Sequence, residues 1–154
     1  MGHFEKFTLH GFCDASDIAY AAVVYIIGNG SNKILSSFVT AKTKVAPLVQ
    51  PSTPVMELYS CVLLSDLVSN VKEALMDEIS ISGVVCWSDS LDALHWIKNE
   101  KKVGTRAIQS RIMKIRKLVP AENWRHCPTK LNPADVGRGM SRLNCCCGFL
   151  RIQI

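Results

Sequence analysis

The chain contains little charge for its length and no long uninterrupted hydrophobic run. Only 20% of its 154 residues are charged, whereas 48% are hydrophobic, which excludes intrinsic disorder and predicts a packed globule. The longest uncharged apolar run, residues 18–27, is shorter than the roughly 20 residues that span a bilayer. The opening segment MGHFEKFTLH also lacks the apolar core of a signal peptide. We therefore expect a soluble intracellular protein, cytoplasmic or nuclear, that makes no membrane contact.

The sequence also lacks C-x-x-C pairs, internal repeats and low-complexity linkers. Its seven cysteines are therefore expected to be reduced and not to bind zinc. Four of them stand singly in apolar segments, where a free cysteine acts as a small hydrophobe, and the other three, at residues 145–147, have no physical explanation in the sequence. The length suits one domain. We predict a monomer with one domain over residues 1–142 and an atypical Cys-rich tail over residues 143–154.

The two parts of the chain carry opposite charge. Residues 1–99 hold 6 Lys and Arg against 10 Asp and Glu, whereas residues 100–154 hold 12 against 3, which gives net charges of −4 and +9. Seven of the basic residues fall within residues 101–117, where phosphate contacts and counterion release could hold a polyanion. The structural alternative is a solvated helix face.

Residue patterning predicts three strands at the start of the chain. Segments rich in Val, Ile and Tyr indicate strands at residues 7–15, 20–27 and 33–40. The GNGS turn at residues 28–31 is typical of an antiparallel meander. Residues 41–53 are predicted to form a polar loop that contains proline.

A long helix is predicted next, with Thr53 as its N-cap, Pro54 at its first position and apolar residues at helical spacing as far as Leu75. The elements expected after it are a strand at 79–87, a helix at 90–99, a basic amphipathic helix at 105–119 and a strand at 123–127. This order implies a mixed sheet with helices on its faces, an α/β fold.

Four acidic residues, Asp14, Glu57, Asp89 and Asp135, lie where these strands end or helices begin. Strand ends and helix starts at one edge of a sheet can bring four carboxylates into one cluster. Their mutual repulsion in low dielectric would cost stability unless a cation offsets it. Oxygen ligands suit Mg²⁺ or Mn²⁺, and two such ions can activate water and stabilise the leaving oxygen of a phosphodiester. The pattern therefore predicts hydrolysis of a nucleic-acid backbone.

Each acid also has a structural explanation when it is taken alone. Asp14 could open a turn. Glu57 in the first turn of a helix would be stabilised by the helix dipole. Asp89, or the serine before it, could be an N-cap. The Asn-Pro pair at residues 132–133 could begin a terminal helix. The sequence alone leaves these alternatives open.

The four acids lie in recognisable flanking motifs. The motifs are DAS at 14–16 followed by a Tyr-Ala pair, TPVMELYS at 53–60, WSDS at 87–90 with Trp96 following, and WRHCPTKLNPAD at 124–135. Together they resemble the ribonuclease H domain of BEL/Pao-type retrotransposon polyproteins. The resemblance runs from about residue 7 to residue 142, and the ordered set Asp, Glu, Asp, Asp is its most specific part.

The resemblance implies a ribonuclease H-like fold, with a five-stranded sheet in the order 3-2-1-4-5 whose first three strands are antiparallel. It implies an endonuclease that uses two Mg²⁺ ions, or Mn²⁺, to cut the RNA strand of RNA–DNA hybrids and leaves 5′-phosphate and 3′-hydroxyl ends. Asp14, Glu57, Asp89 and Asp135 take the catalytic and metal-ligand roles. The implied partners are the hybrid and a reverse transcriptase domain in the parent polyprotein.

Other residues near the motifs have separate predictions. Contacts with nucleic acid are predicted for Ser16, Ser90, Lys101, Lys102, Arg106, Lys130 and Arg138. His126 lies on a predicted strand, not on the longer loop that carries a mobile histidine in many ribonucleases H, so we predict a packing role. Asp17 is predicted to be a solvated turn residue, and the three tryptophans are predicted to be core residues.

Three functional hypotheses follow from the sequence. The first is an active metal-dependent ribonuclease H. The second is a catalytically inactive, nucleic-acid-binding remnant of a retrotransposon polyprotein, because the tail departs from the family's pattern. The third is a related nuclease such as an integrase, which is disfavoured because integrases usually show the order Asp, Asp, Glu.

Overall fold

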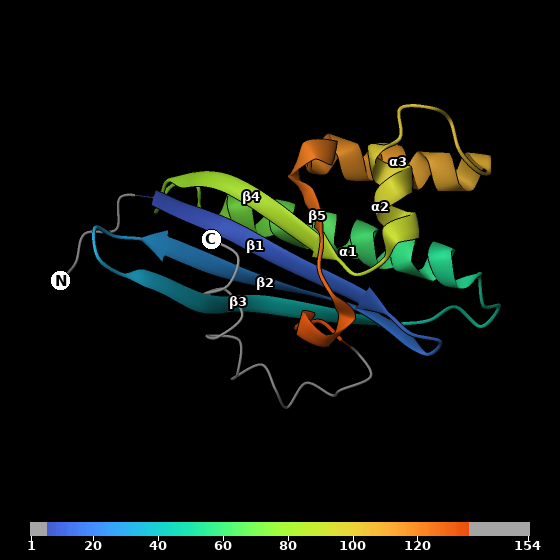
Figure 1. Ribbon diagram of the computed structural model, residues 1–154, viewed down its shortest axis with the longest axis horizontal. Coiled ribbons are helices and arrows are strands. Elements are labelled where there is room, and N and C mark those ends of the chain that lie inside the picture. The colour runs from blue at the N-terminus through green and yellow to red at the C-terminus, as the bar shows by residue number, and fades with distance from the viewer. Residues whose placement is uncertain (1–5, 136–154) are drawn as a thin grey trace.

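A computed structural model describes residues 6–135 of the chain. Five strands form one mixed sheet in the order β3-β2-β1-β4-β5, with three α-helices packed beside it (Figure 1). The strands are β1 (Lys6–Ala15), β2 (Ala19–Asn29), β3 (Ile34–Val45), β4 (Ile81–Ser88) and β5 (Trp124–His126). The helices are α1 (Thr53–Leu75), α2 (Leu91–Lys98) and α3 (Arg106–Leu118), with 3₁₀ turns η1 (Ala121–Asn123) and η2 (Thr129–Leu131). The predicted α/β class and strand order are confirmed.

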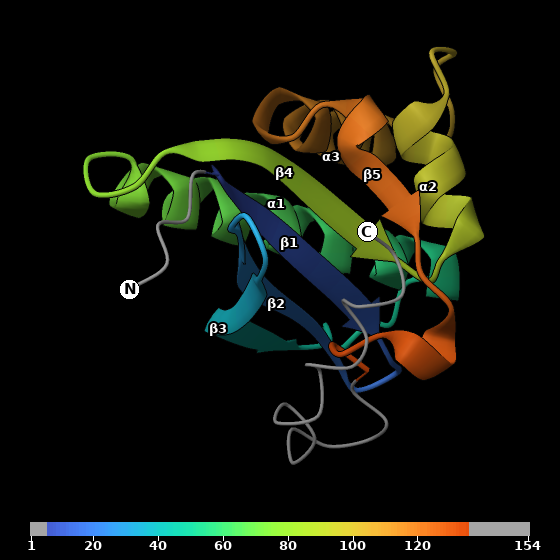
Figure 2. The same ribbon diagram turned by 60° about the vertical axis from the view of Figure 1, so that its left-hand side comes forward.

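The strand directions bring the carboxyl ends of β1 and β4 to one edge of the sheet. β2 is antiparallel to both β1 and β3, which is the predicted meander. β4 is parallel to β1, and β5 is parallel to β4 (Figure 2). Cys13 is paired with Ser88 at the ends of β1 and β4. The residues that directly follow these two, Asp14 near the end of β1 and Asp89 just after β4, therefore lie at the same edge of the sheet.

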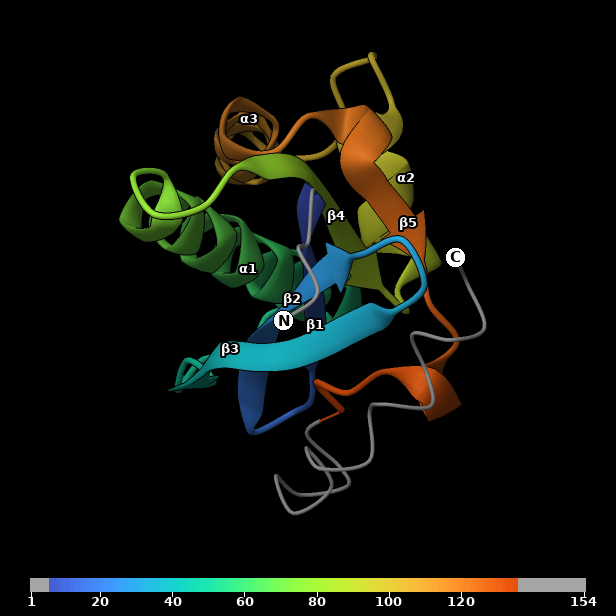
Figure 3. The same cartoon turned by 90° about the vertical axis from the view of Figure 1, so that its left-hand side faces the viewer.

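One face of the sheet carries the helices. The helices lie on one side of the sheet in Figure 3. Alternation along β1 places Leu9, Gly11 and Cys13 on this face, and Leu9 and Cys13 belong to a buried cluster to which all three helices contribute. At Gly11, an added Cβ would lie 2.5 Å from Cδ1 of Leu64 on α1. Glycine at this strand position therefore lets α1 approach the sheet closely.

The opposite face of the sheet, called here the second face, has its own apolar cluster. The ring of Phe12 is stacked with that of Trp87 at 6.1 Å between centroids and meets Tyr25 edge-on at 6.0 Å. Among the described residues of this cluster, none comes from α1, α2 or α3. Aromatic side chains, not a helix, thus bury the centre of the second face.

The boundary of β3 differs from the prediction. We expected the strand to end at residue 40, but it continues to Val45, whose partner in β2 is Ala19. β3 is an edge strand, and most of its side chains are exposed on both faces. Because an edge strand needs no continuous apolar pattern, the Lys and Thr residues at 42–44 looked like loop sequence.

The start of α1 also differs from the prediction. The N-cap is Ser52 and not Thr53, which is the first helical residue, and Pro54 follows it within the first turn. The backbone carbonyl of Ser52 accepts from the N–H of Met56 at 3.0 Å. As a result, the first turn of α1 contains no acidic residue, and Glu57 lies beyond it.

The remaining predictions about the whole chain have mixed outcomes. Within residues 6–135, no helix combines the length and apolarity required to cross a membrane. The described cysteines are free and buried, as expected: Cys13, Cys61, Cys86 and Cys127. The predicted tail over residues 143–154 lies outside the described residues, so the domain boundary at residue 142 stays a prediction.

Candidate metal centre

Three carboxylates from distant parts of the sequence meet at the edge where β1 and β4 end. Asp14 is the penultimate residue of β1, Glu57 lies on α1, and Asp89 directly follows β4. One carboxylate oxygen from each lies within 4.8 Å of the others. Strand pairing brings Asp14 and Asp89 together, and the packing of α1 against β1 adds Glu57.

Burial makes this acidic cluster electrostatically unusual. Asp14 is only 6% exposed, although aspartate side chains lie mostly at protein surfaces. The pKa of Glu57 is raised from 4.5 to about 8, first by burial and then by the negative charges of Asp14 and Asp89, while a hydrogen bond from the backbone of Ala15 opposes the shift. The fold therefore holds three acids where their joint ionisation is costly without a counter-charge.

The donor set fits a divalent cation. The Oε2 atom of Glu57 is buried and has no hydrogen-bond partner among residues 6–135. All three candidate ligands offer carboxylate oxygens, which are the ligands that Mg²⁺ and Mn²⁺ prefer. A cation held by Asp14, Glu57 and Asp89 would offset the repulsion among their carboxylates.

The structural explanations for two of the acids fail. Ser90, and not Asp89, is the N-cap of α2, because its hydroxyl accepts from the N–H of Ala93 at 3.2 Å. Ser88 accepts from the N–H of Ser90 at 3.2 Å and so fixes the turn that carries Asp89. Glu57 lies outside the first turn of its helix, where the effect of the helix dipole is strongest. Helix capping thus does not explain Asp89, and the helix dipole does not explain Glu57.

Asp135 is not one of the three carboxylates whose oxygens lie within 4.8 Å, and its catalytic role stays a prediction. The segment that carries it is nevertheless tied to the cluster by Asn132, which is 4% exposed. The side-chain amide of Asn132 donates to the carbonyl of Cys13 at 2.8 Å, and its oxygen accepts from the N–H of Ala134 at 3.0 Å. The residue before Asp14 and the turn before Asp135 are thereby joined.

Asn132 is the positioning residue whose role was not predicted from the sequence. Residues 132–135 form a turn closed by a 3.2 Å bond from the N–H of Asp135 to the carbonyl of Asn132, and the rest of a terminal helix begun by the Asn-Pro pair would lie outside the described residues. The available signal was an Asn just before a Pro, which favours such turns. Its long-range contact with β1 has no sequence signature.

The two serines predicted to contact nucleic acid have local structural roles. The hydroxyl of Ser16 donates to the carbonyl of Ala19 at 3.1 Å and accepts from the N–H of Ile18 at 3.3 Å, closing the turn between β1 and β2. Ser90 caps α2. The neighbouring Asp17 is exposed, as predicted. Contacts of the two serines with nucleic acid stay predictions.

The structure separates the basic segment into exposed and engaged residues. Lys101, Lys102 and Arg106 are exposed around the connection between α2 and α3, which turns at Gly104 with a φ of 74°. Lys130 is also exposed, on η2. Arg138 lies outside the described residues. Their exposure is compatible with contacts to phosphate groups, and these contacts stay predictions.

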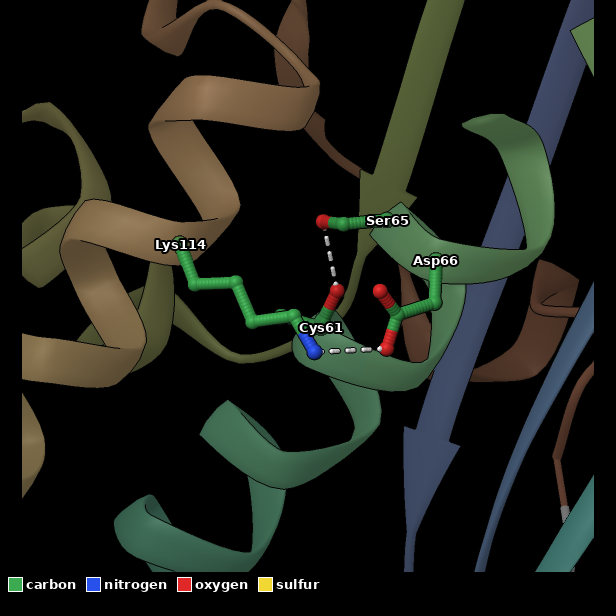
Figure 4. Close-up of polar contacts among 4 residues, drawn as sticks. All are labelled: Cys61, Ser65, Asp66 and Lys114. Carbon is green, nitrogen blue, oxygen red and sulfur yellow. Dashed lines mark hydrogen bonds and ion pairs between the residues drawn. The ribbon is translucent and has the colours of Figure 1, made fainter. Parts of the chain in front are cut away.

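Three other basic residues of α3 are engaged by the protein itself. Arg116 donates to the carbonyls of Ile97 at 2.6 Å and Trp96 at 3.3 Å, and so caps the end of α2. Lys114 pairs with Asp66 of α1 at 3.0 Å, near the bond from Ser65 to the Cys61 carbonyl (Figure 4). The guanidinium of Arg111 lies 4.5 Å from the ring centre of Tyr59. The solvated-face alternative is therefore wrong for Arg116, whereas Lys114 remains about half exposed, at 52%, beside Asp66.

The prediction for His126 is wrong. The side chain is exposed, because β5 is a short edge strand whose His126 faces solvent instead of the core. The tryptophan prediction is confirmed: Trp124 is fully buried, Trp87 is 8% exposed, and Trp96 packs against the main cluster.

The fold and its acidic edge define a ribonuclease H-like domain. The N-terminal RNase H domain of a Mycobacterium tuberculosis protein, solved as a fusion with maltose-binding protein, has a TM-score of 0.55 at 13% identity, covering 95% of this chain and 96% of that one. RNase H1 from the archaeon Halobacterium salinarum has a TM-score of 0.49 at 11% identity, covering 84% of this chain and 90% of that one. A foamy viral protease-reverse transcriptase in complex with an RNA/DNA hybrid has a TM-score of 0.46 at 13% identity, covering 80% of this chain and 17% of that one.

The sequence itself identifies the family. The profile of the Pao retrotransposon-like RNaseH-like domain matches residues 1–90, and the chain belongs to this family. These residues include Asp14, Glu57 and Asp89. No curated protein matches the chain.

Proposed function

We propose that this protein is a metal-dependent endonuclease that hydrolyses the RNA strand of RNA–DNA hybrids and derives from a BEL/Pao-type retrotransposon polyprotein. The observation that carries the proposal is the convergence of Asp14, Glu57 and Asp89, whose carboxylate oxygens lie within 4.8 Å of one another. In a chain of the Pao ribonuclease H-like family, this cluster stands at the carboxyl edge of parallel strands, where the phosphodiester would be cut.

Each acid has a role in the proposed site. Two bound Mg²⁺ ions, or Mn²⁺ in their place, would activate a water molecule and stabilise the leaving oxygen of the phosphodiester. Asp14, buried at the end of β1, and Asp89, held by the turn at Ser88, would be rigid ligands. Glu57 would approach from α1 and lose its proton when a cation binds. Asp135 would complete the ligand set from the turn that Asn132 anchors.

Exposed cations would hold the substrate through its backbone. Lys101, Lys102 and Arg106 project around the connection between α2 and α3, and Lys130 projects from η2. Recognition of an A-like hybrid depends on shape, phosphates and 2′-hydroxyls more than on bases, so little sequence preference is expected. We further propose that the domain acts inside the cell as a monomer beside a reverse transcriptase domain of the same polyprotein.

A cleavage assay tests the proposal. The purified chain is incubated with an RNA–DNA hybrid labelled at the RNA 5′-end, with Mg²⁺, with Mn²⁺ or with a chelator. We expect cleavage with either metal, none with chelator, and products with 3′-hydroxyl ends. Asp89→Asn should lower the rate by more than about 100-fold, because even changes outside the ligand shell cost 10–100-fold in metal sites.

The matched control is Asp92→Asn, which removes a nearby exposed acid of α2 that is outside the cluster. This variant should cut at the rate of the unmodified chain. If the unmodified chain and Asp89→Asn bind the hybrid equally and neither cuts it, the protein is the inactive nucleic-acid-binding remnant instead. Equal cutting of single-stranded RNA would also contradict the proposed substrate.

A further inference from the structure

A pocket of about 520 Å³ lies on the second face of the sheet, apart from the acidic cluster. Its floor includes Ile27, Val85 and Trp87, which belong to the apolar cluster of that face. The volume lies within the roughly 300–1,000 Å³ that is usual for small-molecule sites. The pocket is therefore large enough for a ligand of nucleotide size.

The lining of this pocket is cationic. Lys98 from the end of α2 and Arg125 from β5 both reach it, together with His126. No acidic side chain is present among the described residues that line it. Within residues 6–135, the ion pair between Lys114 and Asp66 does not involve this pocket, and neither Lys98 nor Arg125 has an acidic partner. Two positive charges thus remain unbalanced beside a preformed hollow.

His10, which also lines this pocket, adds a neutral hydrogen-bond donor. Its Nδ1 accepts from the indole N–H of Trp87 at 3.2 Å, and the two rings are stacked at 6.2 Å and 19°. Burial, and then the charge of Arg125, lower the pKa of His10 to about 4, so the ring is neutral near pH 7. A neutral imidazole that accepts at Nδ1 carries its proton at Nε2, which leaves Nε2–H as a donor.

We propose that this second-face pocket binds a phosphomonoester, with Arg125 and Lys98 supplying charge and His10 and Thr8 supplying neutral donors. Arg is suited to phosphate because its guanidinium offers several N–H groups in a fixed plane. The same phosphate chemistry could come from a free nucleotide or from the 5′-phosphate end of a nucleic-acid strand. The site is separate from the proposed metal centre and does not depend on its activity.

Binding is followed by the indole N–H signal of Trp87 in nuclear magnetic resonance spectra, while AMP or inorganic phosphate is titrated into the full chain without metal. The signal of Trp87 should shift in a saturable manner, and the signal of Trp124, which is buried on the helix-bearing side, should not. Arg125→Gln should weaken AMP binding about tenfold or more, since it removes a charge-assisted bond. Lys98→Gln should act in the same direction.

The controls distinguish a free nucleotide from a strand end as the source of phosphate. They also test the pocket independently of the proposed metal centre. Lys72→Gln, at the last turn of α1, should bind AMP as the unmodified chain does, and Asp89→Asn should also bind it normally even when cleavage is lost. A 5′-phosphorylated oligonucleotide that shifts Trp87, where AMP does not, identifies a strand end as the source. Absence of any Trp87 shift, equal binding by Arg125→Gln, or an equal shift with a 5′-hydroxyl oligonucleotide would overturn the proposal.

Discussion

Glu57 is an acidic residue of the cluster whose ionisation depends on the fold. Its carboxyl group is partly buried beside Asp14 and Asp89, and its pKa is raised from 4.5 to about 8. A raised carboxyl pKa means that the folded protein binds a proton more tightly than the unfolded chain between these two values. Folding and cation binding must therefore both respond to pH at this residue.

Without a divalent cation, the contribution of Glu57 to the free energy of unfolding should fall as the pH rises from about 4.5 to about 8. Below this window Glu57 is protonated in both states and its favourable contribution is fully present. Above the window the contribution is lost. Urea denaturation at a series of pH values measures the slope, and Glu57→Gln should flatten it.

Magnesium should reverse this dependence, because a cation binds the ionised form of Glu57. The increase in Tm produced by Mg²⁺ should be larger at about pH 8 than at about pH 6. In Glu57→Gln the increase should be small and nearly independent of pH. An increase that is the same at both pH values in the unmodified chain would contradict the assignment of Glu57 as a ligand.

Asn132→Ala tests the tie between β1 and the turn that precedes Asp135. The variant leaves the carbonyl of Cys13 and the N–H of Ala134 without their side-chain partner. Each buried group left unsatisfied costs about 1–3 kcal/mol, so we expect a loss of unfolding free energy of this order. Chemical denaturation measures the loss.

The matched control is Asn70→Ala, which replaces an exposed asparagine on α1 and should change the unfolding free energy little. If Asn132→Ala is as mild as this control, the contact does not anchor the turn. Asn132→Ala should also weaken the Mg²⁺-induced rise in Tm, since Cys13 directly precedes Asp14.

At the scale of elements, the close approach of α1 to β1 places Glu57 beside Asp14. Gly11→Ala would put a Cβ 2.5 Å from Leu64 Cδ1 and 3.0 Å from Val68 Cγ2. Both side chains are buried and have little room to move, so overpacking should cost about 1–3 kcal/mol. Thermal denaturation measures the change, and Gly83→Ala, whose Cβ would meet only Thr8 at 3.3 Å, is the milder control.

The elements that were predicted well are those with a strong local pattern. α2 and α3 begin after the serine and threonine that cap them, Ser90 and Thr105, and these caps were the predicted helix starts. The last five residues of β3 were missed because an edge strand exposes both faces and shows no apolar alternation. A capping residue or an apolar pattern marks the end of an element only where one face of that element is buried against the rest of the protein.

At the scale of the whole molecule, basic residues differ in what they can offer to a nucleic acid. Lys101 and Lys102 are exposed, whereas Lys114 is paired with Asp66. The double variant Lys101→Gln/Lys102→Gln should lower the magnitude of the slope of log K against log salt by about 2, since each phosphate contact contributes about 0.9. Fluorescence anisotropy with a labelled hybrid measures the slope.

Lys114→Gln is the control for charge alone. It removes one positive charge from the same segment but should leave the slope nearly unchanged, because the ion pair with Asp66 already occupies this ammonium group. Equal slopes for all three proteins would mean that the connection between α2 and α3 does not contact the hybrid.

The sequence by itself determined the order of strands and helices along the chain, the burial of the tryptophans, and which acids are candidate metal ligands. It could do so because hydrophobic period and motif spacing are local properties of the chain. The tertiary structure decided which groups are brought together: three carboxylates at one edge, Asn132 bonded to β1, and Arg116 used as a cap. These contacts join residues far apart in the chain, and only the pairing of β1 with β4 and the packing of α1 bring them within bonding distance.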